Sequence, residues 1–386
     1  MKNIKIDIYR PVIHRCFRCG YCKYSSDFYA YNCPIYDKFR NDGAMPGGLL
    51  WLTNALWNQE IEVTKDYSEL IYSCTMCGNC NKKCPYEFHD TITDMILSAR
   101  EYLIEHNVVP QSVKRYLMNS IMGKSPWGEN GKEECSLLLE KYLYTPACDW
   151  LLYLGDMACY DTYSLSSVKK WIELLKAADI SFGLLEEPLD GSDILSLGET
   201  ELFAACCQKA VEFYQKMDVK RICTFSPHSY HVFKNYFPQY GGRFQVTHYT
   251  QLLANLVEVR KLKFSQSAEY KVAYHDPCYL GRWNQDYESA RFLLEQSGMF
   301  LVEFPFSKED AFCCGGGGGN IYTDCLGGGE RGAARRRIKE AKEMGVEVLA
   351  TACPVCTAML QDAVREEDTR NDIVVRDLID LLFESL

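Results

Sequence analysis

The sequence predicts an α+β multidomain fold, in which a mostly helical module is followed by two α/β repeats. Two runs of four cysteines lie within the first 84 residues, and the segments around them have helical periodicity. The rest of the chain repeats itself, and each copy alternates apolar strands with helices, which is typical of parallel α/β packing. The predicted parts are a cysteine-rich module at 1–110, a helical connection at 111–145, a first repeat at 146–265 and a second repeat at 266–386.

Composition disfavours several classes of protein. The 386 residues are 47% hydrophobic, which allows a sizeable core, and a formal net charge of −10 disfavours a nucleic-acid partner. No apolar run is long enough for a transmembrane helix, and the N-terminal segment lacks the apolar core of a signal peptide. Nothing therefore suggests an oxidising compartment in which disulfides persist, and we expect a reducing cytoplasm with little oxygen.

Helical patterns surround the two cysteine runs. Leu49 to Leu70 lies between the runs and has helical periodicity. Thr91 to His106 follows the second run and is predicted to be a helix with Asp90 or Thr91 as N-cap. Residues 108–140 are predicted to form a helical connection with glycine-rich breaks.

The cysteine spacing predicts iron–sulfur clusters. The second run has the spacing C-x-x-C-x-x-C-x-x-x-C-P of bacterial ferredoxins, in which the fourth cysteine binds the other cluster of a pair. The first run departs from it, because ten residues rather than three separate Cys22 from Cys33. A pair of four-thiolate zinc sites is the alternative. The predicted ligands of two cubane [4Fe-4S] clusters are Cys16, Cys19, Cys22 and Cys84 (set A) and Cys33, Cys74, Cys77 and Cys80 (set B).

A third group of cysteines occurs in the second repeat only. It consists of Cys278, Cys313, Cys314, Cys353 and Cys356 (set C). Ile222–Tyr230 aligns with Leu349–Thr357, and the intervals between the other positions agree within three residues. The aligned positions of the first repeat are Asp156, Leu189, Asp190, Ser226 and Ser229. Since leucine cannot bind a metal and serine is a weak ligand beside thiolates, the first repeat is predicted to hold no cluster.

In the second repeat, strands are predicted at 271–275, 301–306 and 347–352, and helices at 286–297, 330–344 and 357–366. This alternation places set C at strand ends, where parallel sheets bind their ligands. Gly315–Gly319 would let the backbone approach a cluster closely. A phosphate-binding loop is the alternative, but no Gly-Lys-Ser/Thr follows.

The second repeat resembles the cysteine-rich CCG domain of heterodisulfide reductases and their relatives. The resemblance rests on the motifs His275-Asp-Pro-Cys278-Tyr-Leu-Gly-Arg282, Cys313-Cys314-Gly315 and Ala352-Cys-Pro-Val-Cys356. With the ferredoxin-like module ahead of it and the inter-repeat segment His248–Leu253, nearly the whole chain resembles the fused, D-type subunit of these enzymes. The resemblance implies a noncubane [4Fe-4S] cluster, made of two fused Fe–S units that share an iron and a sulfur, with set C as its ligands and as the catalytic residues.

The predicted absence of a cluster from the first repeat bears on the function of the chain. In that family, the subunits that split heterodisulfides carry two facing noncubane clusters, so the missing thiolates disfavour this mechanism here. We expect an electron-transfer subunit of an anaerobic heterodisulfide-reductase-like complex. Its alternatives are a one-cluster reductase of a protein or small-molecule disulfide, the iron–sulfur subunit of a glycolate- or lactate-type dehydrogenase, and a docking scaffold without enzymatic activity.

The chain has no flavin or nicotinamide fingerprint, so FAD is expected only in a partner. The resemblance implies a flavoprotein of the heterodisulfide reductase A type or an electron-transferring flavoprotein. It also implies a client reductase, for example of the benzoyl-CoA or acyl-CoA type, within a hetero-oligomeric complex.

Several other residues have simpler interpretations. His275 either hydrogen-bonds near set C or only ends a strand, and Cys325 is a weak candidate to line the same site. Arg331 and Arg335–Arg337 are expected on a solvated helix face rather than at an anion site. The remaining cysteines are expected to pack as small hydrophobic side chains: Cys135, Cys148, Cys159, Cys206, Cys207 and Cys223.

Overall fold

The structure is a computed structural model that describes residues 6–127, 133–186, 189–265, 270–367 and 372–386. Its N-terminal part contains helices and no named strand among the described residues. These elements are α1 (Ile6–Ile13), η1 (Tyr21–Lys23), α2 (Pro34–Phe39), η2 (Asp42–Ala44), α3 (Pro46–Trp57), α4 (Lys65–Tyr72), α5 (Asn79–Lys83), η3 (His89–Thr91), α6 (Ile92–Glu105), α7 (Gln111–Ile121) and α8 (Glu133–Lys141).

The helical pattern predicted over Leu49–Leu70 is two helices rather than one. Helix α3 ends at Trp57, and α4 begins after Thr64, whose side chain accepts a hydrogen bond from the Tyr67 amide at 3.1 Å. A threonine N-cap starts a new helix because it satisfies an amide that would otherwise lack an intrahelical partner. The helix predicted at 91–106 is confirmed as α6.

The first repeat contains a four-stranded parallel sheet with the order β2-β1-β3-β4. Its elements are β1 (Trp150–Tyr153), α9 (Gly155–Tyr160), α10 (Thr162–Ala177), β2 (Phe182–Gly183), α11 (Ser192–Ser196), α12 (Thr200–Lys216), β3 (Arg221–Thr224), α13 (Pro227–Asn235), η4 (Phe237–Tyr240), β4 (Gln245–His248) and α14 (Tyr249–Glu258).

The second repeat contains an equivalent sheet with the order β6-β5-β7-β8. Its elements are β5 (Lys271–Tyr274), α15 (Ser289–Gln296), β6 (Phe300–Leu301), η5 (Lys308–Asp310), α16 (Asn320–Thr323), α17 (Ala333–Glu343), β7 (Val348–Thr351), α18 (Pro354–Glu367), β8 (Val374–Asp377) and α19 (Leu378–Glu384).

The common strand order of the two sheets confirms the internal repeat. The alignment of Ile222 with Leu349 makes Thr224 equivalent to Thr351, and these two residues pair with His248 and Asp377 in the same register. The short edge strands β4 and β8 were not expected from the sequence, and β6 is shorter than the strand predicted at 301–306. The many helices and two small parallel sheets agree with an α+β chain, whereas the boundaries between its parts remain predictions.

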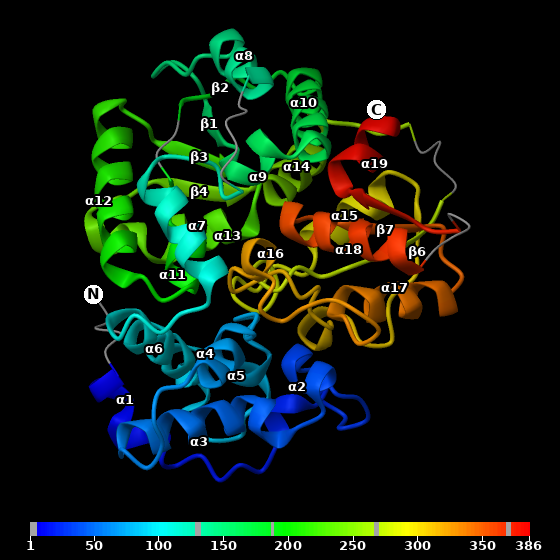
Figure 1. The fold of residues 1–386 in the computed structure, drawn as a ribbon. Helices are drawn as coiled ribbons and strands as arrows, with labels where there is room; N and C mark the ends of the chain where they lie inside the picture. Colours follow the sequence, from blue (N-terminus) through cyan, green and yellow to red (C-terminus); the bar gives the residue numbers. More distant parts are fainter. Residues whose placement is uncertain (1–5, 128–132, 187–188, 266–269, 368–371) are drawn as a thin grey trace.

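The three parts pack against one another (Figure 1). The N-terminal helices lie beneath both repeats, and their core is continuous with side chains of α11 to α13. A second core joins the two sheets and includes Trp171, Phe225 and Tyr249 of the first repeat with Tyr274 and Leu378 of the second. In the part of the chain that the structure describes, no helix is long and apolar enough to cross a membrane.

Candidate metal centre

The four cysteines of set A line one cavity in the N-terminal part. Cys22 lies in η1, and Cys84 follows α5, whose last turn accepts a bond from the Cys84 amide. Gly47 and Leu50 of α3 close the cavity from the other side, and a Cβ on Gly47 would lie 3.5 Å from the Cys16 sulfur. The predicted grouping thus brings four thiols to one place.

The cysteines of set B are buried together beside it. Cys33 is the N-cap of α2, Cys74 follows α4, and Cys80 lies in α5. Burial raises the pKa of the Cys74 thiol to about 11, and burial also raises the pKa of Cys33, with further contributions from the charges of Cys77 and Cys74. Buried thiols of this kind become thiolates when metal displaces the proton, since the metal supplies the compensating charge.

Set C lies at the carboxyl ends of the strands in the second repeat, as the sequence predicts. Cys278 follows β5, Cys353 follows β7, and Cys356 lies in the first turn of α18. All five thiols are buried. His275 joins them, because one of its ring nitrogens lies within 4.8 Å of the Cys314 and Cys356 sulfurs.

His275 is therefore a sixth candidate ligand or hydrogen-bond partner, and the interpretation that it only ends a strand is incomplete. Burial lowers the pKa of His275 to about 3, so its ring is neutral and keeps a lone pair. Its Nδ1 atom has no hydrogen-bond partner among the described residues. Of the two alternatives that the sequence left open for His275, the structure favours a place beside the thiols of set C.

Set B and set C touch each other, which the sequence does not show. The side chains of Cys77, Cys278 and Cys313 form one buried cluster with Tyr279 against it. A hydrogen bond with Cys313, together with burial, raises the pKa of the Cys77 thiol well above its ordinary value. The Cys313 sulfur also lies 3.7 Å from the Thr75 hydroxyl. The three sets therefore form a series in the order A, B, C.

Two buried arginines flank set B and provide a test of the iron–sulfur interpretation. Arg100 donates to the Cys74 carbonyl at 2.5 Å and also to Ser196 and Gly318, so it contacts all three parts of the chain. Arg282 donates from Nε to the Cys77 carbonyl at 2.8 Å, and from Nη1 to the Glu309 and Ala311 carbonyls.

Neither guanidinium forms an ion pair with a carboxylate among the described residues, although both are less than 5% exposed. An isolated buried charge is costly unless an opposite charge lies near it. Burial by itself lowers the pKa of Arg282, but the negative charges of the Cys77, Cys278 and Cys313 thiolates outweigh it and raise this pKa. Thiolate-ligated clusters would supply the same negative charge beside Arg282. The residues present thus fit anionic iron–sulfur clusters at sets B and C.

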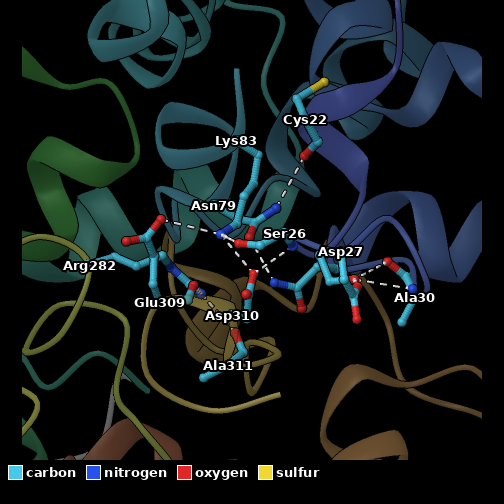
Figure 2. A network of polar contacts seen from close by, with 12 residues as sticks. Cys22, Ser26, Asp27, Ala30, Asn79, Lys83, Arg282, Glu309, Asp310 and Ala311 are labelled. Carbon is cyan, nitrogen blue, oxygen red and sulfur yellow. Dashed lines mark hydrogen bonds and ion pairs between the residues drawn. The ribbon is translucent and has the colours of Figure 1, made fainter. Parts of the chain in front are cut away.

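The ten residues between Cys22 and Cys33 dock the N-terminal part onto the second repeat. Tyr24 and Tyr31 form an antiparallel bridge, so the insertion folds back on itself. The Ser26 amide donates to Asp310 at 3.0 Å, and Lys83 of α5 lies 2.7 Å from the same carboxylate (Figure 2). The departure from ferredoxin spacing therefore joins this module to the segment that precedes Cys313.

The glycine run Gly315–Gly319 lies close to the backbone of the second cysteine run, and not only to the neighbouring cysteines of set C. A Cβ on Gly317 would lie 2.6 Å from the Thr75 carbonyl oxygen, and one on Gly318 would lie 2.4 Å from the Cys74 carbonyl oxygen. Gly318 also has a φ of +64°. Only glycine fits such a close contact between two backbones.

The five positions of the first repeat that align with set C line a single pocket: Asp156, Leu189, Asp190, Ser226 and Ser229. This convergence confirms the alignment. The arrangement of strand ends and helix starts is the same in both repeats, whereas the side chains at these places differ in chemistry.

The structure corrects two expectations for other residues and bears on the open alternative for Cys325. Arg337 is fully buried, and Arg336 reaches Asp37 and the Tyr31 carbonyl of the N-terminal part, so this helix face is not simply solvated. Cys325 lies near Ser112 rather than among the thiols of set C. Cys135 and Cys159 form a disulfide instead of packing as free thiols.

Two family models match the chain. Residues 12–88 match the 4Fe-4S dicluster domain. Residues 272–361 match the cysteine-rich CCG domain. The two matched ranges contain the predicted ligands of sets A and B and of set C, respectively.

Several curated proteins are similar. The chain is 32% identical to "Probable iron-sulfur-binding oxidoreductase FadF" of Bacillus subtilis (strain 168), covering 82% of this chain and 47% of that protein. It is 30% identical to "EtfAB:quinone oxidoreductase" of Syntrophomonas wolfei, covering 83% and 47%. The chain thus spans about half the length of these two relatives.

A third relative matches over more of its length. The chain is 27% identical to the D-type subunit of the dihydromethanophenazine:CoB--CoM heterodisulfide reductase of Methanosarcina barkeri, covering 83% of this chain and 79% of that protein. The two family models and these relatives agree with the cysteine motifs, and the chain belongs to the CCG-domain family of iron–sulfur oxidoreductases.

Proposed function

We propose that this chain is the electron-transfer subunit of an oxidoreductase complex, in which set A and set B each hold a cubane [4Fe-4S] cluster and set C holds a noncubane cluster. Cys77 carries the proposal, because it belongs to set B and packs directly against Cys278 and Cys313 of set C. Clusters held at these places would form a continuous path for electrons, since each would adjoin the next. Iron–sulfur clusters would supply the one-electron chemistry.

The chain's own residues position and insulate this path. Arg282 holds the loops of Cys77 and Cys313 together through backbone carbonyls. Burial of sets B and C excludes water from the thiolates, and hydrogen bonds and fixed positive charges near the sulfurs tune the reduction potentials. Set C, which is buried and lies beside a pocket, is the proposed functional terminus.

Set A is the proposed point of exchange with a partner. Cys19 is exposed, in contrast to the buried thiols of sets B and C. Phe17 is 72% exposed and Tyr21 is 44% exposed, and both line the same cavity as set A. Exposed aromatic side chains beside a redox site favour contact with another protein.

The proposed partner is a flavoprotein that contains FAD, of the electron-transferring or heterodisulfide reductase A type, and the electrons pass on to a client reductase. The name of one relative, EtfAB:quinone oxidoreductase, favours an electron-transferring flavoprotein. A cytoplasmic, anaerobic complex is the proposed setting. Reduction of a disulfide at set C is the second candidate function, and the pocket beside set C supports it.

Metal analysis of the anaerobically purified chain tests the cluster assignment. About twelve irons per chain are expected, from three clusters with four irons each. A sample in which zinc predominates would contradict all three assignments.

A second experiment tests whether electrons from the partner enter the chain at set A. In the variant Cys19→Ser, the flavoprotein partner should fail to reduce sets B and C, while dithionite should still reduce both. The variant Cys148→Ser is the control, since Cys148 lies outside the three sets. Normal reduction of set C by the partner in Cys19→Ser would show that electrons enter elsewhere.

A further inference from the structure

The two cysteine runs contain equivalent loops, Cys16–Cys19 in set A and Cys74–Cys77 in set B. Each has the pattern C-x-x-C, and the residue before its second cysteine has a left-handed backbone, with a φ of +56° at Arg18 and +52° at Met76. The two loops therefore match in local conformation, so their surroundings can be compared directly.

The second repeat covers the set B loop. Thr75 and Met76 are only 1% and 6% exposed. Gly317 and Gly318 pack against the loop backbone, and the Nε1 atom of Trp283 donates to the Met76 carbonyl at 3.2 Å. A loop of this conformation thus serves as a docking surface for another folded part of the chain.

The described part of the chain leaves the set A loop uncovered. Phe17, the counterpart of Thr75, is 72% exposed, and Arg18 is exposed beside it. The Arg18 guanidinium lies 3.9 Å from the centroid of the Trp51 ring, which is itself 45% exposed. The comparison favours a separate protein that covers this loop as the second repeat covers its counterpart.

Aromatic side chains extend the exposed surface around this loop. The Phe17 ring lies 5.4 Å from the Tyr86 ring, and the Tyr21 ring lies 4.9 Å from the ring of Phe28, which is 53% exposed. Phe17, Tyr21 and Tyr86 also line the cavity of set A. Exposed aromatic side chains that adjoin one another are typical of protein–protein contacts.

The same surface is positively charged, although the chain has a net charge of −10. Residues 8–26 contain no Asp or Glu, and their basic residues are Arg10, Arg15, Arg18 and Lys23. Lys23 pairs with Asp42, whereas Arg15 and Arg18 are exposed and form no ion pair with a carboxylate among the described residues. Such a surface attracts a partner with exposed carboxylates and repels a basic one.

We propose that this arginine–aromatic surface docks a redox protein whose own docking surface is acidic. The surface consists of Arg15, Phe17, Arg18, Tyr21, Phe28 and Tyr86. Carboxylates of the partner pair with the two arginines, the aromatic rings are buried in the contact, and the redox centre of the partner comes to the exposed Cys19. This inference rests on the proposed role of set A as the point of exchange.

Binding of an acidic flavoprotein tests the charge preference without electron transfer. The probe is oxidised bacterial flavodoxin, a small acidic protein, which is titrated calorimetrically into the oxidised full chain with its clusters. We expect binding at about 20 mM salt that weakens about tenfold or more at about 200 mM salt, because ions screen exposed charges. No binding, or binding that does not depend on salt, would overturn the proposal.

Variants locate the contact. Arg15→Gln and Arg18→Gln together should weaken flavodoxin binding about tenfold at low salt and remove most of its salt dependence. Arg243→Gln, at an exposed residue of the first repeat, is the matched control and should bind as the wild type does. Iron content reports whether each variant keeps its clusters. Unchanged binding in the double variant would refute the site.

An anionic lipid surface is the competing occupant, since arginines and aromatic side chains also favour membrane surfaces. Vesicles of phosphatidylcholine and phosphatidylserine serve as the probe. Sedimentation of the full chain with these vesicles, together with no binding of flavodoxin, would overturn the proposal.

Electron transfer separates this inference from the function on which it rests. Reduced flavodoxin loses one electron and the cluster at set A gains it, which stopped-flow absorbance follows. The double arginine variant should slow this step about tenfold at low salt. Salt-dependent binding of flavodoxin without reduction of the clusters would contradict the proposed role of set A, while it would support the docking surface.

Discussion

The two repeats have the same backbone plan and opposite chemistry. Each has four parallel strands in the same order, and each brings five aligned positions to the carboxyl ends of its strands. In the second repeat these positions are thiols, and in the first they are two carboxylates, two hydroxyls and a leucine. The comparison shows that the same strand ends and helix starts gather these five positions in both repeats, whereas the chemistry of their side chains differs.

The residues that cap the last helix of each repeat also lie at equivalent positions and also differ in chemistry. His248 caps α14 and Asp377 caps α19, at equivalent ends of β4 and β8. Burial lowers the pKa of His248 to about 3 and raises the pKa of Asp377 to about 8. Both caps thus favour the neutral form at equivalent sites, although one residue is a base and the other an acid.

The largest effect is expected from removing a thiolate of set C. Cys353→Ser should abolish electron flow to the client and reduce the iron content by up to four of about twelve atoms, because serine is a poor ligand for iron. The matched control is Ser226→Ala, at the aligned position of the first repeat, which should keep all the iron. EPR of the dithionite-reduced protein distinguishes the clusters. Unchanged turnover in Cys353→Ser would mean that set C is only structural.

Removal of the buried positive charge of Arg282, between sets B and C, should have the next largest effect. Arg282→Gln leaves the Cys77, Glu309 and Ala311 carbonyls without their donor, and we expect a loss of about 3 kcal/mol in the free energy of unfolding. Loss of the positive charge should also make the potentials of sets B and C more negative.

Anaerobic redox titration and thermal unfolding measure both effects of Arg282→Gln. Arg221→Gln, at a partly exposed residue of the first repeat, is the control and should change neither potential. Unaltered reduction potentials in Arg282→Gln would show that the guanidinium only connects the loops of Cys77 and Cys313 through hydrogen bonds.

The pH dependence of stability distinguishes the two caps. Since the folded state raises the pKa of Asp377 to about 8, the folded protein binds more protons than the unfolded chain between about pH 4 and 8. The associated stability is present below about pH 4 and is lost as the pH rises through 8.

Asp377→Asn keeps a capping side chain and removes this titration. Relative to the wild type, the variant should gain on the order of 1–2 kcal/mol between pH 6 and pH 8, measured by anaerobic denaturant unfolding. Thr250→Val, beside the His248 cap, should not show this trend in the same pH range. A parallel pH profile of wild type and Asp377→Asn would contradict the assignment.

The smallest effect is expected at the docking loop. Asp310→Asn weakens the partly buried pair with Lys83 and should lower stability by about 1 kcal/mol, as seen in the thermal midpoint. Asp27→Asn is the matched control, since its carboxylate bonds only within the same loop. Equal midpoints for wild type and Asp310→Asn would mean that the ten-residue insertion does not depend on this contact.

Short-range patterns were the most predictable features. The cysteine groups, the repeat and the helix at 91–106 follow from local spacing, because a few residues suffice to bring thiols together or to turn a helix. The separation of α3 from α4 was missed, although the Thr64 cap was visible in the sequence. The edge strands β4 and β8 were missed because their side chains are partly exposed, so their sequences lack the continuous apolar run that marks the buried strands β5 and β7.

The sequence by itself determined which residues could bind metal, that the first repeat has no thiols at the positions aligned with set C, and to which family the motifs point. Only the tertiary structure decided that Cys77 touches Cys313, that Arg282 lies between two sets, and that His228 of one repeat faces Cys353 of the other. These contacts join residues more than 100 positions apart. Their geometry depends on how three hydrophobic surfaces pack together, and no local spacing encodes that arrangement.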